Sequence, residues 1–150
     1  MAKMLTLLLA STLVLITGCA TRAEPAPTLA TGDSVTRMAP TLTLERFLRA
    51  ANSNDLQTMG ELFGTQDGSI RRLDSPEDVE RRMYALASVL RHDDYELVGD
   101  RIVPGRLGRA VELDVRMVMN DRAYVVPFTM VRVSDDLWLV EQIDVAVLTR

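Results

Sequence analysis

Residues 111–130, VELDVRMVMNDRAYVVPFTM, predict a β-hairpin. Apolar and polar side chains alternate on both sides of Asn120-Asp121, and this dipeptide suits a two-residue hairpin turn. With the turn at these two residues, a single register aligns the apolar rows of both strands. Because one register satisfies every pair, the sequence predicts two neighbouring antiparallel strands that share one apolar face. The expected pairs are Val111 with Met130, Leu113 with Phe128, Val115 with Val126, and Met117 with Tyr124.

The chain after Asp93 has the pattern of an antiparallel meander. Extending the register to the last hairpin places Met130 opposite Glu141 and Val126 opposite Val145, so one carboxylate is expected in an apolar row. Pro127 lies within an expected central strand, where proline is rare, and a bulge there would shift the face of every later residue. The expected strands are 94–103, 108–119, 122–133 and 137–148, with turns at Pro104-Gly105, Asn120-Asp121 and Asp135-Asp136.

Three helices are expected ahead of the sheet. The first follows Thr43, with Leu42 and Phe47 placed as a hydrophobic staple. The second is short and ends in the loop 64–68, after which 69–73 is a candidate edge strand. The third, the longest, starts at Ser75 as N-cap and closes at Arg91-His92. Their expected buried residues are Leu44, Phe47, Leu48 and Ala51 in the first, Leu56, Met59 and Phe63 in the second, and Val79, Met83, Leu86 and Leu90 in the third.

These elements predict an α+β fold, with N-terminal helices packed on a curved antiparallel sheet of four strands, or of five if 69–73 joins it. The order of elements, with FLRAANSNDLQTMGELF at 47–63 and WLVEQIDV at 138–145, resembles the cystatin-like fold. Within that fold it is similar to the nuclear transport factor 2-like superfamily, over residues 41–150.

The resemblance implies one domain, a cone whose helices and concave sheet enclose a pocket. Ketosteroid isomerase, scytalone dehydratase and limonene epoxide hydrolase use that pocket for catalysis, whereas other members bind or dimerise without it. No catalytic motif of these enzymes matches this chain residue by residue. The resemblance therefore implies the pocket alone.

Residues 1–18 have the organisation of a secretory signal peptide, with a positive charge at Lys3 and uncharged residues from 5 to 16. That run is too short to span a bilayer, which takes about 20 apolar residues. Ile16-Thr17-Gly18-Cys19 resembles the bacterial lipobox, which implies cleavage before Cys19, a diacylglyceryl thioether on its sulfur, and a new amino terminus acylated with a chain such as palmitate. Two alternatives stay open: an ordinary signal peptidase site around Gly18-Cys19-Ala20, and an uncleaved leader in which Cys19 is incidental.

Lipidation of Cys19 would anchor the protein to the lipid bilayer of the cell envelope, facing the periplasm. Ala20 follows the cysteine, and in the sorting scheme of enteric-type bacteria the lack of Asp there implies the outer membrane. Residues 20–40 contain three prolines and no apolar periodicity. Segment 19–40 is therefore expected to be a lipidated cysteine with a flexible linker that carries the domain 41–150.

Composition excludes several classes of function. The chain of 150 residues is 47% hydrophobic and 25% charged, as globular proteins are, and its net charge of -4 argues against a nucleic-acid partner. Cys19 is the only cysteine, so the folded part has no disulfide, thiolate metal site or thiol nucleophile. His92-Asp93-Asp94 could suggest a metal site, but neighbouring residues in one turn rarely converge on one ion, and a capped helix end is the preferred interpretation. No metal and no cofactor are expected.

Glu141 is the candidate catalytic residue. A carboxylate facing an apolar cavity suits a general base near neutral pH, because burial disfavours its charged form. The alternative places Glu141 at the rim of the sheet or in a slipped register. Phe128, Met130 and Tyr124 belong to the same expected row and are the candidate ligand-binding residues.

Other patterns have simpler explanations. Asp114 and Asp144 are expected to lie about 10 Å apart across Pro127, on the solvated face of the sheet. The stretch GTQDGSIRR at 64–72 lacks the spacing of a phosphate-binding loop. Trp138 could line a pocket, and packing beside Val133 is the preferred interpretation.

Three functions are compatible with the sequence. The first is a membrane-tethered, non-enzymatic domain that binds an apolar small molecule or a protein partner. The second is a cone-fold isomerase, dehydratase or hydrolase that works through Glu141. The third is a structural envelope protein that forms a homodimer through the sheet. A filled space between the sheet and the helices would leave only interaction at the surface.

Overall fold

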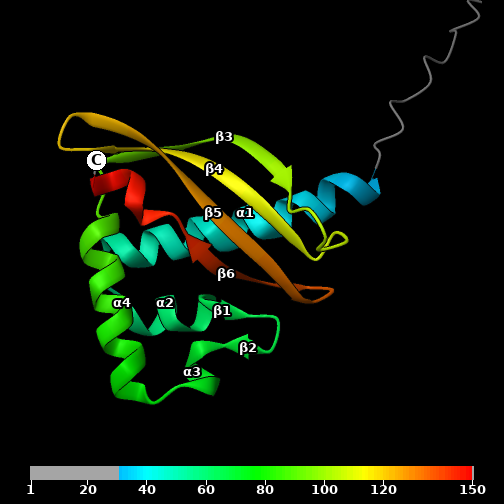
Figure 1. Cartoon of the computed structure of the whole chain (residues 1–150), viewed down its shortest axis with the longest axis horizontal. Coiled ribbons are helices and arrows are strands. Elements are labelled where there is room, and N and C mark those ends of the chain that lie inside the picture. The colour runs from blue at the N-terminus through cyan, green and yellow to red at the C-terminus, as the bar shows by residue number, and fades with distance from the viewer. Residues whose placement is uncertain (1–30, 150) are drawn as a thin grey trace, which may run out of the picture.

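The computed structural model describes residues 31–149, and the expected signal peptide at 1–18, Cys19 and residues 20–30 lie outside this range. The described chain is α+β, with helices followed by a four-stranded antiparallel sheet, as expected (Figure 1). The helices are α1 (Thr31–Asn52), α2 (Leu56–Leu62), α3 (Ile70–Leu73) and α4 (Pro76–Leu90), with the 3-10 helix η1 (Val145–Thr149) after the sheet. The strands are β1 (Gly64–Thr65), β2 (Gly68–Ser69), β3 (Asp94–Ile102), β4 (Ala110–Met119), β5 (Arg122–Ser134) and β6 (Leu137–Ile143).

The β4–β5 hairpin has the expected register. Each of the four predicted pairs, from Val111 with Met130 to Met117 with Tyr124, is present. Asn120 and Asp121 form the turn with φ angles of 50° and 63°. Both angles lie in the left-handed region that a two-residue hairpin turn of the favoured twist requires. This part of the prediction is confirmed.

The β5–β6 register agrees with the prediction at first and then shifts. Phe128 pairs with Ile143 as expected, but Met130 pairs with Val140, and the register breaks between Thr129 and Met130. The expected pairing of Met130 with Glu141 is therefore wrong, because Glu141 is the extra residue of a β-bulge. The shift directs Val140, which is 0% exposed, into the core, where it also bridges to Phe63.

Pro127 fits the sheet without a bulge of its own. It pairs with Asp114 on β4, and its carbonyl oxygen accepts a hydrogen bond from the Asp144 nitrogen at 3.0 Å. In a strand the nitrogen and the carbonyl of one residue point to the same side, so the Pro127 nitrogen faces the β6 side. Strand β6 ends at Ile143, so no ladder donor is needed there. The expected strand 137–148 is wrong beyond this point, because η1 begins at Val145.

Helix α1 begins earlier than the sequence predicts. It starts at Thr31, so residues 31–40 belong to a helix and not to a linker, and Pro40 lies inside it. Ala39 packs against the core and Pro40 is buried, so tertiary contacts support the helix at the proline. Leu42 is 52% exposed within the helix, and the expected hydrophobic staple is wrong. The predicted buried face is confirmed at Leu44, Phe47, Leu48 and Ala51.

The segment between α2 and α4 differs from the expected edge strand at 69–73. Gly64 and Thr65 pair with Ser69 and Gly68 in a small separate sheet, and Ile70–Leu73 forms the short helix α3. The Ile70 side chain is 5% exposed, and its nitrogen donates to the Phe63 carbonyl at 2.9 Å. Helix α3 therefore begins at Ile70, whose side chain is buried in the core.

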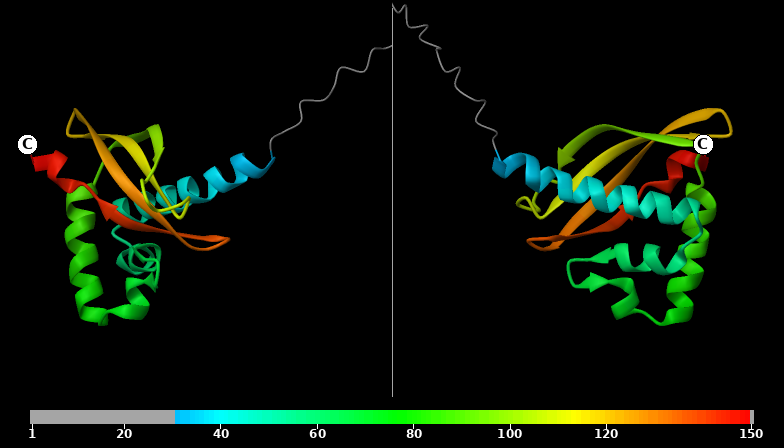
Figure 2. Two further views of the ribbon diagram at one scale, coloured as in Figure 1. Left: turned by 45° about the vertical axis from the view of Figure 1, so that its right-hand side comes forward. Right: turned by 180° about the vertical axis from the view of Figure 1, so that it is seen from behind.

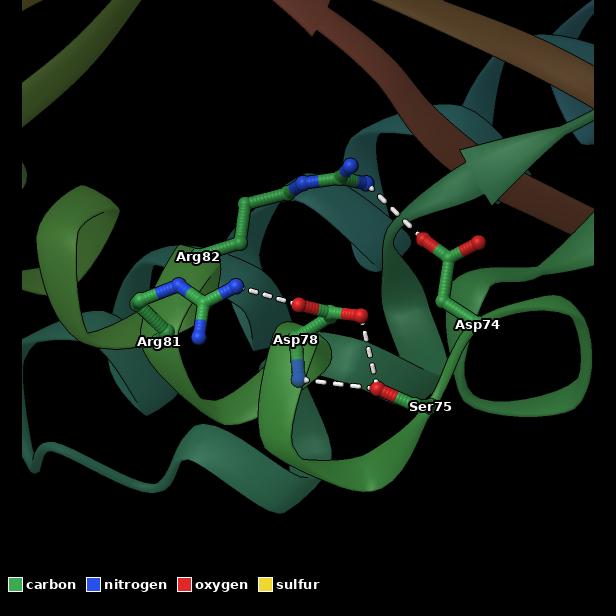
Figure 3. A network of polar contacts seen from close by, with 5 residues as sticks. All are labelled: Asp74, Ser75, Asp78, Arg81 and Arg82. Carbon is green, nitrogen blue, oxygen red and sulfur yellow. Dashed lines mark hydrogen bonds and ion pairs between the residues drawn. The ribbon is translucent and has the colours of Figure 1, made fainter.

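Helix α4 begins as predicted (Figure 3). The Ser75 hydroxyl accepts from the Asp78 nitrogen at 3.3 Å and donates to the Asp78 carboxylate at 2.7 Å, while Arg81 pairs with Asp78 and Arg82 with Asp74. The Ser75 hydroxyl, with the charge of Arg81, holds the pKa of Asp78 below its ordinary value of 3.8. A lowered pKa stabilises the fold above pH 3.8, and this stabilisation is lost as the pH falls below that value.

The sheet has the order β3-β4-β5-β6, and its twist is visible in Figure 2. Helix α1 crosses one face of the sheet, while α2 and α4 lie on the β6 side (Figure 1). Side chains from all of these elements form one apolar core. The largest of those almost fully excluded from solvent are Phe47, Phe128, Leu48, Met59, Met83, Leu90, Met117 and Met130.

Candidate functional site

The space between the sheet and α1 is filled by side chains. Phe128 and Met130, two of the expected ligand-binding residues, are both 0% exposed and belong to the core. Three surface hollows of the described chain lie elsewhere, and no described residue of α1 lines any of these three. A ligand would therefore have to bind outside the interior of the fold.

Glu141 is held in an ion pair with Arg106. Both carboxylate oxygens lie 2.9 Å from Nη2 of Arg106, on the connection between β3 and β4. The two side chains are only 20% and 33% exposed, and within the described chain the buried Nε of Arg106 has no hydrogen-bond partner. The bulge thus turns Glu141 toward an arginine that is distant in sequence. We interpret this ion pair as a structural contact that holds the β3–β4 connection against β6.

We expect Glu141→Gln to reduce the free energy of unfolding by about 1–2 kcal/mol, because the partly buried Arg106 guanidinium loses its carboxylate. Ligand binding should be unaffected. Urea unfolding of the variant, beside Glu96→Gln in the more exposed Glu96–Arg116 pair as control, measures the difference. Equal stability of wild type and Glu141→Gln would contradict this role.

His92 has a structural environment. His92 is 8% exposed, and its Nδ1 lies 2.8 Å from the Leu90 carbonyl oxygen. The Asn52 amide contacts both Nε2 and the backbone of His92, which ties the end of α1 to the end of α4. The ring also meets Tyr95 edge-on with centroids 5.3 Å apart. This arrangement fits the expected capped helix end.

The remaining sequence candidates are engaged in local contacts. Asp114 accepts a hydrogen bond from Arg101 at 2.6 Å, and Asp144 accepts one from the Ala146 nitrogen at 3.2 Å. Trp138 is 4% exposed in the core, and its strand partner is Arg132. None of these three residues lines the hollow described next.

Tyr124 lines a surface hollow of about 460 Å³. We call it the rim hollow. It lies where the end of α4, the β4–β5 turn and η1 come together, near the C-terminus (Figure 1). Most of its lining is apolar, and its volume is in the range of small-molecule sites. Its lining residues are Val89, Met119, Asn120, Arg122, Tyr124, Val145 and Leu148.

The rim hollow offers binding surface and no acid–base pair. Met119 is 9% exposed at its base, and Tyr124, Val145 and Leu148 pack against the core while remaining partly accessible. Its seven lining residues include no carboxylate, imidazole or thiol. A hollow of this kind can hold an apolar molecule, and it lacks the paired groups that hydrolysis or isomerisation needs.

Of these seven residues, only Tyr124 was predicted from the sequence as a ligand-binding residue. The hollow exists because the chain leaves the sheet after Ile143, so that Val145 and Leu148 fold over the end of the hairpin in η1. One local signal was present: Asp144, whose carboxylate accepts the Ala146 nitrogen, is a residue type that favours turns. Val89 on α4 and Met119 on β4 line one hollow only because the tertiary structure brings their elements near each other.

Two other hollows are less suited to an apolar molecule. One, of about 400 Å³, lies between α2 and α4 and is bordered by polar side chains that include Asp55, Gln57, Arg71 and Glu80. Another, also of about 400 Å³, lies between the β1–β2 and β5–β6 turns. There Arg109 and Arg132 share the surface with Asp67 and Asp135, so the charges balance.

Residues 31–149 contain no group of three His, Cys, Asp or Glu side chains that could hold a metal ion. In the same part of the chain no helix is long and apolar enough to cross a membrane. Comparison of the chain with protein-family models, with curated proteins and with solved structures gave no match.

Proposed function

We propose that this protein is a lipid-anchored protein of the cell envelope whose domain binds an apolar small molecule in the rim hollow, without catalysis. The observation that carries the proposal is the hollow itself. It is partly open to solvent at Tyr124, Val145 and Leu148, whereas the interior of the domain is filled. Its apolar lining and volume match a binding site for a small molecule.

We further propose that the domain is a nuclear transport factor 2-like cone with a filled interior. The order of helices followed by a four-stranded antiparallel sheet supports this assignment. In such a cone the ligand would bind at the rim and not inside. A Glu141-dependent enzyme has less support, because the Glu141 carboxylate is paired with Arg106.

Anchoring is proposed at Cys19, in the outer membrane with the domain facing the periplasm. The support is the sequence Ile16-Thr17-Gly18-Cys19 after an uncharged run, followed by Ala20. The two or three acyl chains of such an anchor give stable attachment, since each buried methylene contributes about 0.8 kcal/mol.

A protein partner or a homodimer through the sheet has weaker support than a small ligand. The outer face of the sheet carries the Glu96–Arg116 pair and the contacts of Arg101 with Glu112 and Asp114. The edge strand β3 exposes apolar side chains, but it also has a register shift between Leu97 and Gly99. Edge charges and bulges are devices that oppose pairing with another chain.

The proposal is tested by the binding of a neutral fluorescent apolar probe, N-phenyl-1-naphthylamine, to the mature chain produced without lipid. We expect Val89→Glu to weaken probe binding at least tenfold, because it places a charge on the wall of the rim hollow. Tyr84→Glu is the matched control, since Tyr84 is an exposed apolar residue of α4 outside the hollow. Equal probe binding by wild type, Val89→Glu and Tyr84→Glu would contradict the proposal.

A further inference from the structure

The rim hollow has an apolar base and one polar side. The base is formed by Met119, Tyr124, Val145 and Leu148, which are buried or pack against the core. The polar side is the β4–β5 turn region, which contributes Asn120 and Arg122. A molecule that matches both parts has an apolar body and a polar group at one end.

Arg122 supplies an unpaired positive charge on that polar side. Arg101 and Arg116 on the sheet and Arg106 on the β3–β4 connection each pair with a carboxylate, whereas Arg122 and Arg132 on β5 are in no ion pair within the described part of the chain. Arg122 forms no ion pair with any residue in the described part of the chain. A guanidinium at the edge of an apolar hollow is suited to a carboxylate, which it can bind through two parallel hydrogen bonds.

Two acidic residues, Asp93 and Asp121, lie near this side of the hollow but do not line it. Asp93 is engaged through Oδ2, which accepts the Asn120 nitrogen at 3.1 Å. Asp121 lies in the turn before Arg122, and neither Asp93 nor Asp121 lines the hollow. The lining therefore carries one positive and no negative formal charge.

We propose that the rim hollow binds a free single-chain amphiphile with a carboxylate head, with the chain over Met119 and Leu148 and the carboxylate at Arg122. This inference rests on the proposed function, because it names the class of molecule that the hollow takes. The volume of about 460 Å³ is sufficient for one acyl chain. The Asn120 amide offers a second donor to the carboxylate.

Displacement of N-phenyl-1-naphthylamine by two matched competitors tests the inference. The competitors are dodecanoate and 1-dodecanol, which have chains of equal length and differ in the charge of the head group. The mature chain, residues 19–150, is produced without lipid and kept reduced, and each competitor is used below its aggregation limit. We expect dodecanoate to displace the probe from wild type at about a tenfold lower concentration than dodecanol, because the charged head group pairs with Arg122.

The variant Arg122→Gln should abolish this preference, because it should reduce the affinity for dodecanoate to the affinity for dodecanol. Its unchanged affinity for dodecanol shows that the hollow is still folded. Arg122→Lys, which keeps the charge, should restore part of the preference. Arg72→Gln is the matched control, since Arg72 is exposed on α3 and lies outside the hollow, and it should retain the full preference.

The outcomes separate the two proposals. Equal displacement by dodecanoate and dodecanol, with no effect of Arg122→Gln, would overturn the inference and leave the proposed function in place. Displacement by vesicles of anionic phospholipid, and not by dodecanoate, would also overturn it. Failure of the probe and of both competitors to bind would overturn the proposed function and the inference together.

Discussion

Replacing Phe128 with alanine is expected to reduce the free energy of unfolding by about 3–5 kcal/mol. The side chain is 0% exposed, and it pairs with Leu113 on one side and Ile143 on the other. Truncation removes apolar contacts and leaves a cavity that the surrounding sheet and helices can close only in part. The free energy of unfolding of a domain is about 5–15 kcal/mol, so this loss is a large part of the total stability and raises the unfolded fraction.

Urea unfolding followed by far-ultraviolet circular dichroism measures the effect of Phe128→Ala. The control is Val125→Ala, on the same strand but 50% exposed, which should cost less than about 1 kcal/mol. A loss at Phe128 no larger than the loss at Val125 would mean that Phe128 is not a core residue. In that case the filled interior, on which the placement of the ligand at the rim depends, would also be wrong.

Replacing Cys19 with serine is expected to remove the protein from the membrane fraction completely. Cys19 lies outside the described residues, and this prediction rests on the sequence. Near neutral pH a serine hydroxyl is a far weaker nucleophile than a cysteine thiol, so the thioether that holds the lipid cannot form. Without acyl chains the anchor loses the burial of methylene groups that attaches it to the bilayer.

Fractionation of cells, with mass spectrometry of the mature amino terminus, measures the effect of Cys19→Ser. The control Ala20→Ser changes the next residue and should remain lipidated. An unmodified Cys19 in the wild-type protein would contradict the envelope anchor. The proposed binding by the rim hollow would stand independently, because the hollow lies in the domain and not in the leader.

The β4–β5 hairpin and the start of α4 could be predicted because their signals are local. Residues of the hairpin alternate between two faces, and Asn120-Asp121 accepts the positive φ angles of its turn, so neighbouring residues alone select the register. Ser75 and Pro76 mark the beginning of α4 in the same way. The prediction failed at Thr31–Pro40, which belongs to α1, and at its end Ala39 packs against the core.

The candidate site depended on contacts between distant residues, which composition and periodicity do not encode. Glu141 was expected in an apolar row, but the bulge places Val140 there, and Glu141 meets Arg106, a residue 35 positions away. Burying Val140 in the core is favourable, whereas burying a carboxylate without a partner is costly. No local sequence pattern around Glu141 indicates that Val140 takes its expected place in the apolar row.

The sequence by itself determined the order of the main elements, with three helices ahead of four antiparallel strands, the register of the central hairpin and the amphipathic faces that form the core. These follow from side-chain period and turn chemistry, which act over a few residues. Only the tertiary structure decided where β6 ends, how α4 approaches the hairpin, and hence where a ligand could bind. The rim hollow lies between Val89, Tyr124 and Leu148, and such a space is set by the packing of separate elements rather than by any one of them.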